Sequence, residues 1–223
     1  MAKSKIIRDL ANGDIDIHTA LKRAKVLFDE FQNDDIKQWI NNELTGYSSV
    51  DDLPVYRVHR GSLVGTFIIG RMKYTNASIP IGKMPDNSAE VLLSIYITES
   101  ICTIIRMIEE FEKSNSRFGK PIDADTFPII TKYNGNPYMR IISANVIGNS
   151  FHLNNIVSIV ENKLLEALLF LEKEFGVLDE LDIDTSNKSA DEMKAISDKI
   201  VLIFNDNSIN IGDNNSIKNS KIK

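Results

Sequence analysis

The chain is poor in the residues that build disulfides and metal centres. Its 223 residues include one cysteine and three histidines. A single cysteine excludes an internal disulfide, and Cys102 lies in an apolar run (ESICTIIRMI), where we expect a buried, unreactive thiol and not a nucleophile. His18, His59 and His152 stand apart, without the short spacing of metal-ligating pairs. We therefore expect no metal site and no cofactor.

Other absences exclude further classes of protein. The sequence has no phosphate-binding loop of the G-x-x-x-x-G-K-[ST] type, no dinucleotide-binding fingerprint and no G-x-S-x-G nucleophile elbow. These absences count modestly against an enzyme, because catalytic residues can also meet only in the fold. No apolar run approaches the roughly 18 residues of a membrane span. The charged N-terminus lacks the apolar core of a signal peptide, so we expect a cytoplasmic protein with no membrane partner.

The overall composition is that of a globular domain. Hydrophobic residues make up 43% of the chain and charged residues 26%, enough to build a sizeable core. The formal net charge is −5, so the chain has no global field that attracts DNA or RNA. We do not expect a nucleic-acid partner.

Apolar spacing predicts a helical hairpin at the N-terminus, with a short helix in front. The first helix ends at Asn12-Gly13, the second is capped by Asp14 or Asp16, and the third begins near Asn33 and ends at Gly46. From residue 55 to residue 81, β-branched and aromatic residues alternate with glycines, which predicts two or three short strands.

The rest of the chain predicts an α+β fold, with two long packed helices beside a small antiparallel sheet. The helices are expected at 89–113 and 153–175 and a strand at 141–147, with 114–140 forming a loop that includes a short strand at 129–133. Residues 179–199 read as a linker and a short helix. A strand-like run follows at 200–204 and begins a β-type tail, residues 200–223.

The tail carries two near-copies of one pattern, NDNSINI at 205–211 and DNNSIKN at 213–219. Its isoleucines recur between Asn-rich turns, as in the rungs of a β-solenoid; they are Ile209, Ile211, Ile217 and Ile222. One rung does not bury its own apolar edge, so it would stack on other copies of the chain or on a partner. Three alternatives stay open: a disordered polar tail, self-association, or docking to a partner. The recurring isoleucines favour an ordered tail.

One cluster of cationic and aromatic residues is a candidate ligand-binding site. Its members are Tyr47, Tyr56, Arg57, His59 and Arg60. On a strand, Arg57 and His59 share one face, and cations beside aromatic rings can hold a phosphate or a nucleobase. The alternative is a solvated strand with Tyr56 in the core and Arg57 paired with a carboxylate such as Glu43 or Asp51. No residue is assigned a catalytic role.

The segment 39–57, WINNELTGYSSVDDLPVYR, resembles the N-terminal AbiTii domain of bacterial abortive-infection proteins. The pattern W-x-x-x-E-L-x-G-Y followed by L-P-x-Y-R is matched by Trp39, Glu43, Leu44, Gly46, Tyr47, Leu53, Pro54, Tyr56 and Arg57. The turn at Gly13-Asp14 and the A-L-x-x-A-K-x-L helix at 20–27 are also similar, and the resemblance extends over residues 3–176. Trp39 itself is expected to anchor the core between helices.

The resemblance implies a part in anti-phage defence. Domains of this kind are similar to sensor or adaptor modules, often fused to a toxic effector. Here residues 1–178 form the AbiTii-like domain, and only the linker and the tail follow. We expect a non-enzymatic interaction module that forms homo-oligomers or recruits a separate effector protein or a phage component. The alternative is a nucleotide- or nucleic-acid-binding protein or enzyme that uses the strand Tyr56–Arg60.

Overall fold

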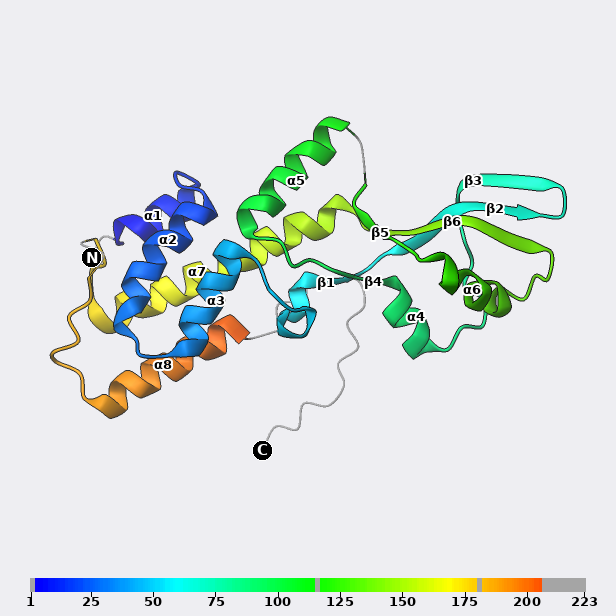
Figure 1. The fold of residues 1–223 in the computed structure, drawn as a ribbon. Helices are drawn as coiled ribbons and strands as arrows, with labels where there is room; N and C mark the ends of the chain where they lie inside the picture. The colour runs from blue at the N-terminus through cyan, green and yellow to red at the C-terminus, as the bar shows by residue number, and fades with distance from the viewer. Residues whose placement is uncertain (1–2, 115–116, 180–181, 206–223) are drawn as a thin grey trace. The chain divides into compact units, whose positions relative to one another are not determined.

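A computed structural model describes residues 3–114, 117–179 and 182–205, and the chain divides into two compact units (Figure 1). The helical unit contains the described residues of Met1–Leu44, Pro54–Tyr56 and Ser158–Lys223. The sheet unit contains those of Thr45–Leu53 and Arg57–Val157. Helices together with small antiparallel sheets confirm the predicted α+β class.

The helical unit begins with the predicted helical hairpin. Its helices are α1 (Lys5–Asn12), α2 (Ile17–Leu27), α3 (Asp34–Thr45) up to Leu44, most of α7 (Ser150–Phe175) and α8 (Ala190–Asn205), with the 3₁₀ turns η1 (Phe28–Glu30) and η3 (Val55–Arg57) up to Tyr56. Gly13, at φ 74°, closes α1 in the left-handed conformation. The Asp16 carboxylate accepts a hydrogen bond from the Thr19 amide at 2.8 Å and so caps α2.

The core of the helical unit is built from the apolar stripes of these helices. The stripe of α7 recurs at three- and four-residue steps and is fully buried at Leu164, Leu168 and Leu171. Aromatic rings fill the space between the helices, and Phe28 lies 5.7 Å from Phe204 of α8, centroid to centroid. The core of this unit therefore includes the last described helix.

The sheet unit contains a four-stranded antiparallel sheet in the order β3-β2-β6-β5 and a two-stranded pair, β1-β4. The strands are β1 (Val58–Arg60), β2 (Ser62–Ile69), β3 (Met72–Ser78), β4 (Ser94–Tyr96), β5 (Gly119–Pro121) and β6 (Met139–Ile147). Its helical elements are α4 (Asp86–Leu93), α5 (Ile101–Ser114), α6 (Phe127–Asn134), the start of α7, and the turns η2 (Val50–Asp52) and η4 (Ala124–Thr126).

Strand β2 shows the two-residue alternation of a strand with one buried face. Leu63 and Phe67 are buried, and Leu63 lies opposite Val146 of β6. Gly65 between them faces Ala144, and a Cβ at this position would lie 2.0 Å from the carbonyl oxygen of Ser143. Glycine is therefore required for β2 and β6 to approach each other at this point.

The predicted helix 89–113 is wrong as a single element. The structure divides it into α4, the strand β4 and α5. The chain becomes extended at Ser94 because β4 pairs with β1, with Val58 opposite Tyr96 and Arg60 opposite Ser94. The helix resumes after Ser100, whose hydroxyl accepts a hydrogen bond from the Thr103 amide. Among the described residues, α7 therefore spans the range predicted for one long helix, and the other predicted range is divided between α4 and α5.

Two short apolar runs predicted as strands are helical. Residues 129–133 lie in α6, which has a proline in its first turn and ends at Gly135 with φ 77°. Residues 200–204 lie in α8, because Ile196, Ile200 and Ile203 form one buried helical face. The β-type tail therefore does not begin at residue 200, and its remaining part, 206–223, lies outside the described residues.

Candidate functional site

Three residues of the WINNELTGY…LPVYR segment, all in the helical unit, form one buried hydrogen-bond chain. The Trp39 indole N–H donates to the Tyr56 hydroxyl at 3.0 Å, and that hydroxyl donates to the Glu43 carboxylate at 2.8 Å. Glu43 is 0% exposed, so its oxygens depend on such donors in place of water. Trp39 is 6% exposed, which confirms its expected place in the core.

Helix α8 also contacts this hydrogen-bonded group, although it lies far from Trp39 and Glu43 in the sequence. The ring of Phe204 stacks on Trp39 with the centroids 4.0 Å apart. The ammonium group of Lys163 on α7 donates to the carbonyl oxygen of Ile203 at 2.9 Å and lies 5.9 Å from the centre of the Tyr56 ring. A buried lysine that satisfies a carbonyl of α8 ties this helix to the core.

Gly46, Tyr47 and Arg57 of the segment lie in the sheet unit and make contacts within it. Gly46 has φ 95°, and a Cβ there would lie 2.8 Å from the carbonyl oxygen of Thr98. The Arg57 side chain is 0% exposed; its guanidinium donates to the carbonyls of Ile97 and Glu99 at 3.0 and 2.7 Å and lies 4.8 Å from the centre of the Tyr47 ring.

These contacts explain the segment as part of the fold. Tyr56 and Arg57 are buried in the turn η3, and the strand begins only at Val58, so the predicted shared strand face of Arg57 and His59 is wrong. A ligand in solvent would not reach the Arg57 guanidinium without displacing its carbonyl partners. Tyr47, at 8% exposed, is likewise buried.

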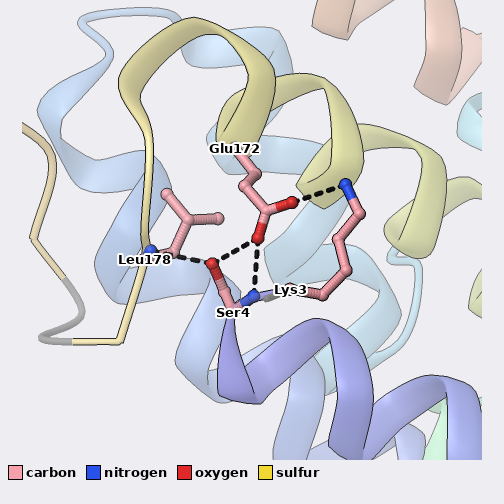
Figure 2. A network of polar contacts seen from close by, with 4 residues as sticks. All are labelled: Lys3, Ser4, Glu172 and Leu178. Atoms are coloured by element: carbon pink, nitrogen blue, oxygen red, sulfur yellow. Dashed lines mark hydrogen bonds and ion pairs between the residues drawn. The ribbon is translucent and has the colours of Figure 1, made fainter. Parts of the chain in front are cut away.

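Hydrogen bonds hold Lys3 and Ser4, which precede α1, against the end of α7 (Figure 2). The Glu172 carboxylate accepts hydrogen bonds from the Ser4 amide, the Ser4 hydroxyl and the Lys3 ammonium, each at 2.6 Å. The amide of Leu178 donates to the Ser4 hydroxyl at 2.9 Å. Burial alone would raise the pKa of Glu172. The hydrogen bonds from Lys3 and Ser4 outweigh this effect and lower the pKa to about 2.

The sheet topology creates a cavity of about 530 Å³ within the sheet unit. In an antiparallel sheet, the starts of β2 and β5 lie at the same end as the termini of β3 and β6. The end of β1 and the first turn of α7 also contribute residues to the cavity at this end of the sheet. The lining residues are Arg60, Gly61, Ser62, Val64, Ser78, Arg117, Ile147, Gly148, Asn149, Ser150 and His152.

The lining of this cavity is cationic and rich in hydroxyl groups. Arg60 and Arg117 are both exposed, and neither guanidinium has an ion-pair partner within the described ranges. The lining residues that the structure describes include no aspartate or glutamate. His152 stacks on His59 with the ring centroids 4.5 Å apart, and burial lowers the pKa of His152, which favours the neutral imidazole.

The structure thus distributes the predicted site residues over different places. Arg60 lines the cavity. His59 is not among the lining residues, but its ring stacks on that of His152, which is. Tyr47, Tyr56 and Arg57 do not line it, and Ile209, Ile211, Ile217 and Ile222 lie outside the described residues. Sequence reasoning missed Arg117, Ser62, Ser78 and the segment 148–152, because they are far apart in sequence and share no motif.

Within residues 3–114, 117–179 and 182–205, no three His, Cys, Asp or Glu side chains cluster in a way that could hold a metal ion. Cys102 is half-buried, which differs from the fully buried thiol that its apolar surroundings predict. Of the helices described, none combines the length and the apolar character that a membrane crossing requires.

A family model described as AbiTii matches residues 4–196. The matched range contains the whole WINNELTGY…LPVYR segment and the cavity, and it ends inside α8. Neither a curated protein nor a solved structure matches the chain significantly.

Proposed function

The chain belongs to the AbiTii family, and from that premise we propose that it is a sensor or adaptor protein of anti-phage defence. The family is one of abortive-infection proteins, which supports the assignment to defence. In this proposal the folded part recognises a cue of infection and the C-terminal segment gathers copies of the chain or recruits an effector. The protein acts by binding and not by turnover of a substrate.

The observation that carries the proposal is that the Asn/Ile-rich segment follows, in the sequence, a helix that is anchored in the core. The family match ends at residue 196, but α8 continues to Asn205 and is held in the core by Phe204 and by the Lys163–Ile203 contact. Residues 206–223 follow directly from this anchored helix. Any partner that binds this segment is therefore linked, through the chain, to a helix that belongs to the core.

The sequence of this segment supports association. It contains four isoleucines, three of them within two near-copies of an Asn-rich pattern and the fourth, Ile222, just after the second copy. Asn-rich turns separated by β-branched residues are typical of stacked rungs, which need neighbours to bury their apolar edges. We therefore propose homo-oligomers as the first form of association and a separate effector or phage component as the partner that follows.

A phage challenge tests this function. Bacteria that express the full chain are compared with bacteria that express a variant in which Ile209, Ile211, Ile217 and Ile222 are replaced by serine. The matched control replaces Asn207, Asn210, Asn214 and Asn219 by serine, which changes the same number of residues and keeps the isoleucines. We expect the full chain and the control to reduce plaque formation and the isoleucine variant to lose this effect. Equal plaque counts with and without the full chain would contradict the proposal.

The alternative, a nucleotide- or nucleic-acid-binding role for Tyr56–Arg60, rests on fewer of its original residues. Tyr56 and Arg57 are engaged inside the fold, whereas Arg60 is exposed and lines the cavity. A ligand-binding role is therefore better attached to the cavity than to the segment Tyr56–Arg60.

A further inference from the structure

We infer that the cavity in the sheet unit binds the phosphate groups of a small phosphorylated molecule, with Arg60 and Arg117 as the principal contacts. This inference concerns a ligand site and is independent of the C-terminal segment. It rests on the shape of the cavity and on the charge and hydrogen-bonding capacity of its lining.

The two arginines define the class of ligand. They come from different elements, Arg60 from the end of β1 and Arg117 from the segment before β5, and the fold brings both to one cavity. A guanidinium is a planar fork of N–H donors that matches phosphate oxygens in bidentate fashion. Because no carboxylate lies among the described lining residues, the positive charge of the cavity is not neutralised from within.

The remaining lining supplies neutral donors for phosphate oxygens. Ser62 and Ser78 stand at the start of β2 and the end of β3, and no hydrogen bond of either hydroxyl occurs within the described residues. The Asn149 side chain accepts from the Phe151 amide at 3.1 Å and so already caps α7. The first backbone amides of this helix therefore offer few hydrogen bonds to a ligand. The two arginines and the two serines are the groups that would bind the phosphate oxygens.

The size of the cavity favours a ligand larger than a phosphate ion. About 530 Å³ lies within the range of sites for small organic ligands. Val64 and Ile147 give the lining an apolar part that a phosphate ion would not use, and a base or sugar could cover it. A nucleoside phosphate fits both parts of this lining.

Isothermal titration calorimetry with the full chain tests the inference. The probes are ATP, adenosine, pyrophosphate and citrate. We expect ATP to bind and adenosine not to bind, because the phosphates supply the main contacts. Binding of pyrophosphate as tight as that of ATP would support the phosphate site and identify an inorganic phosphate as the source of the ligand. Weaker binding of pyrophosphate would support a nucleotide.

Variants distinguish this site from general attraction of anions. Arg60→Gln and Arg117→Gln should each weaken ATP binding about tenfold or more, the usual effect of losing a charge-assisted hydrogen bond. Arg71→Gln is the matched control, because Arg71 is an exposed arginine at the turn between β2 and β3, at the other end of β2. It should leave binding unchanged.

Three results of the calorimetry would overturn the inference, and a fourth comes from a nucleic-acid probe. They are no heat of binding with either phosphorylated probe at millimolar concentration, binding of citrate alone, and equal affinity of the wild-type protein and the Arg60→Gln/Arg117→Gln double variant. Binding of a single-stranded oligonucleotide without binding of ATP or pyrophosphate would also overturn it, in favour of a nucleic-acid surface. Circular dichroism of each variant verifies that the fold is intact, as expected for substitutions of exposed side chains.

Discussion

Replacement of Glu172 by glutamine removes the negative charge of the carboxylate that accepts hydrogen bonds from Lys3 and Ser4. In the structure the carboxylate accepts three hydrogen bonds from Lys3 and Ser4, and its pKa falls from an ordinary value of 4.5 to about 2. A shift of this size corresponds to about 3 kcal/mol of folding free energy. The Lys3 side chain is 55% exposed and its attraction is screened by water, so we expect a loss of about 1 to 2 kcal/mol.

The sign of the pH dependence follows from the lowered pKa. The folded protein holds Glu172 ionised down to about pH 2, whereas the unfolded chain takes up a proton near pH 4.5. The stabilisation is therefore present in full above pH 4.5 and is lost progressively as the pH falls towards 2. Glutamine does not titrate, so the difference in stability between wild type and Glu172→Gln should shrink in the same interval.

Urea unfolding at pH 7 and at pH 3.5, followed by circular dichroism, measures this difference. Glu166→Gln is the matched control, because Glu166 is an exposed glutamate on the same helix. The control should lie within about 0.5 kcal/mol of wild type at pH 7. A Glu172→Gln difference that is as large at pH 3.5 as at pH 7 would refute the reasoning, as would a variant as stable as wild type at pH 7.

Three further substitutions test the core around the WINNELTGY…LPVYR segment by urea unfolding at pH 7. Phe204→Ala removes the ring stacked on Trp39 and should cost about 3 to 5 kcal/mol, whereas Leu202→Ala, at a side chain that is 62% exposed on the same helix, should cost little. Tyr56→Phe removes the hydroxyl between Trp39 and Glu43 and should cost about 1 to 3 kcal/mol; no change would show that this hydroxyl does not stabilise the core. Gly46→Ala should cost more than Gly13→Ala, because both positions have positive φ but only at Gly46 would the added Cβ meet a carbonyl oxygen, at 2.8 Å. Equal costs would contradict this explanation.

The parts of the fold that were predictable have local signals. The ends of α1 and α2 are encoded by Gly13 and by Asp16 with Thr19, residues that act within one turn of the chain. The failure at residues 94–100 has a non-local cause. Ile95 and Ile97 suit a helix or a strand, and pairing of β4 with β1 decided between them. Apolar periodicity carries no information on that partner.

Short apolar runs were ambiguous for a related reason. The run in α8 contains Ile200, Ile203 and Phe204, which fit a strand in isolation and a helix once Ile196 is counted. In α6, the early proline and the closing Gly135 were the signals that favour a helix over a strand. The length of the repeating pattern distinguishes the helix in α8, and the residues at the two ends distinguish it in α6.

The candidate site was predictable only in part. Trp39 was correctly placed in the core, because a lone tryptophan on an apolar helical face is most often an anchor. The cavity unites Arg60, Arg117 and His152, which come from a strand end, a loop and a helix start. Only the order of the strands brings them together, and no spacing in the sequence expresses it.

The claim that the protein acts by gathering copies of itself through its C-terminal segment is tested most directly by its molar mass in solution. Multi-angle light scattering of the full chain should give a multiple of 25.1 kDa, and the variant with serine at positions 209, 211, 217 and 222 should give a smaller assembly or the single-chain mass. The same mass of 25.1 kDa for both proteins at micromolar concentration would contradict the account.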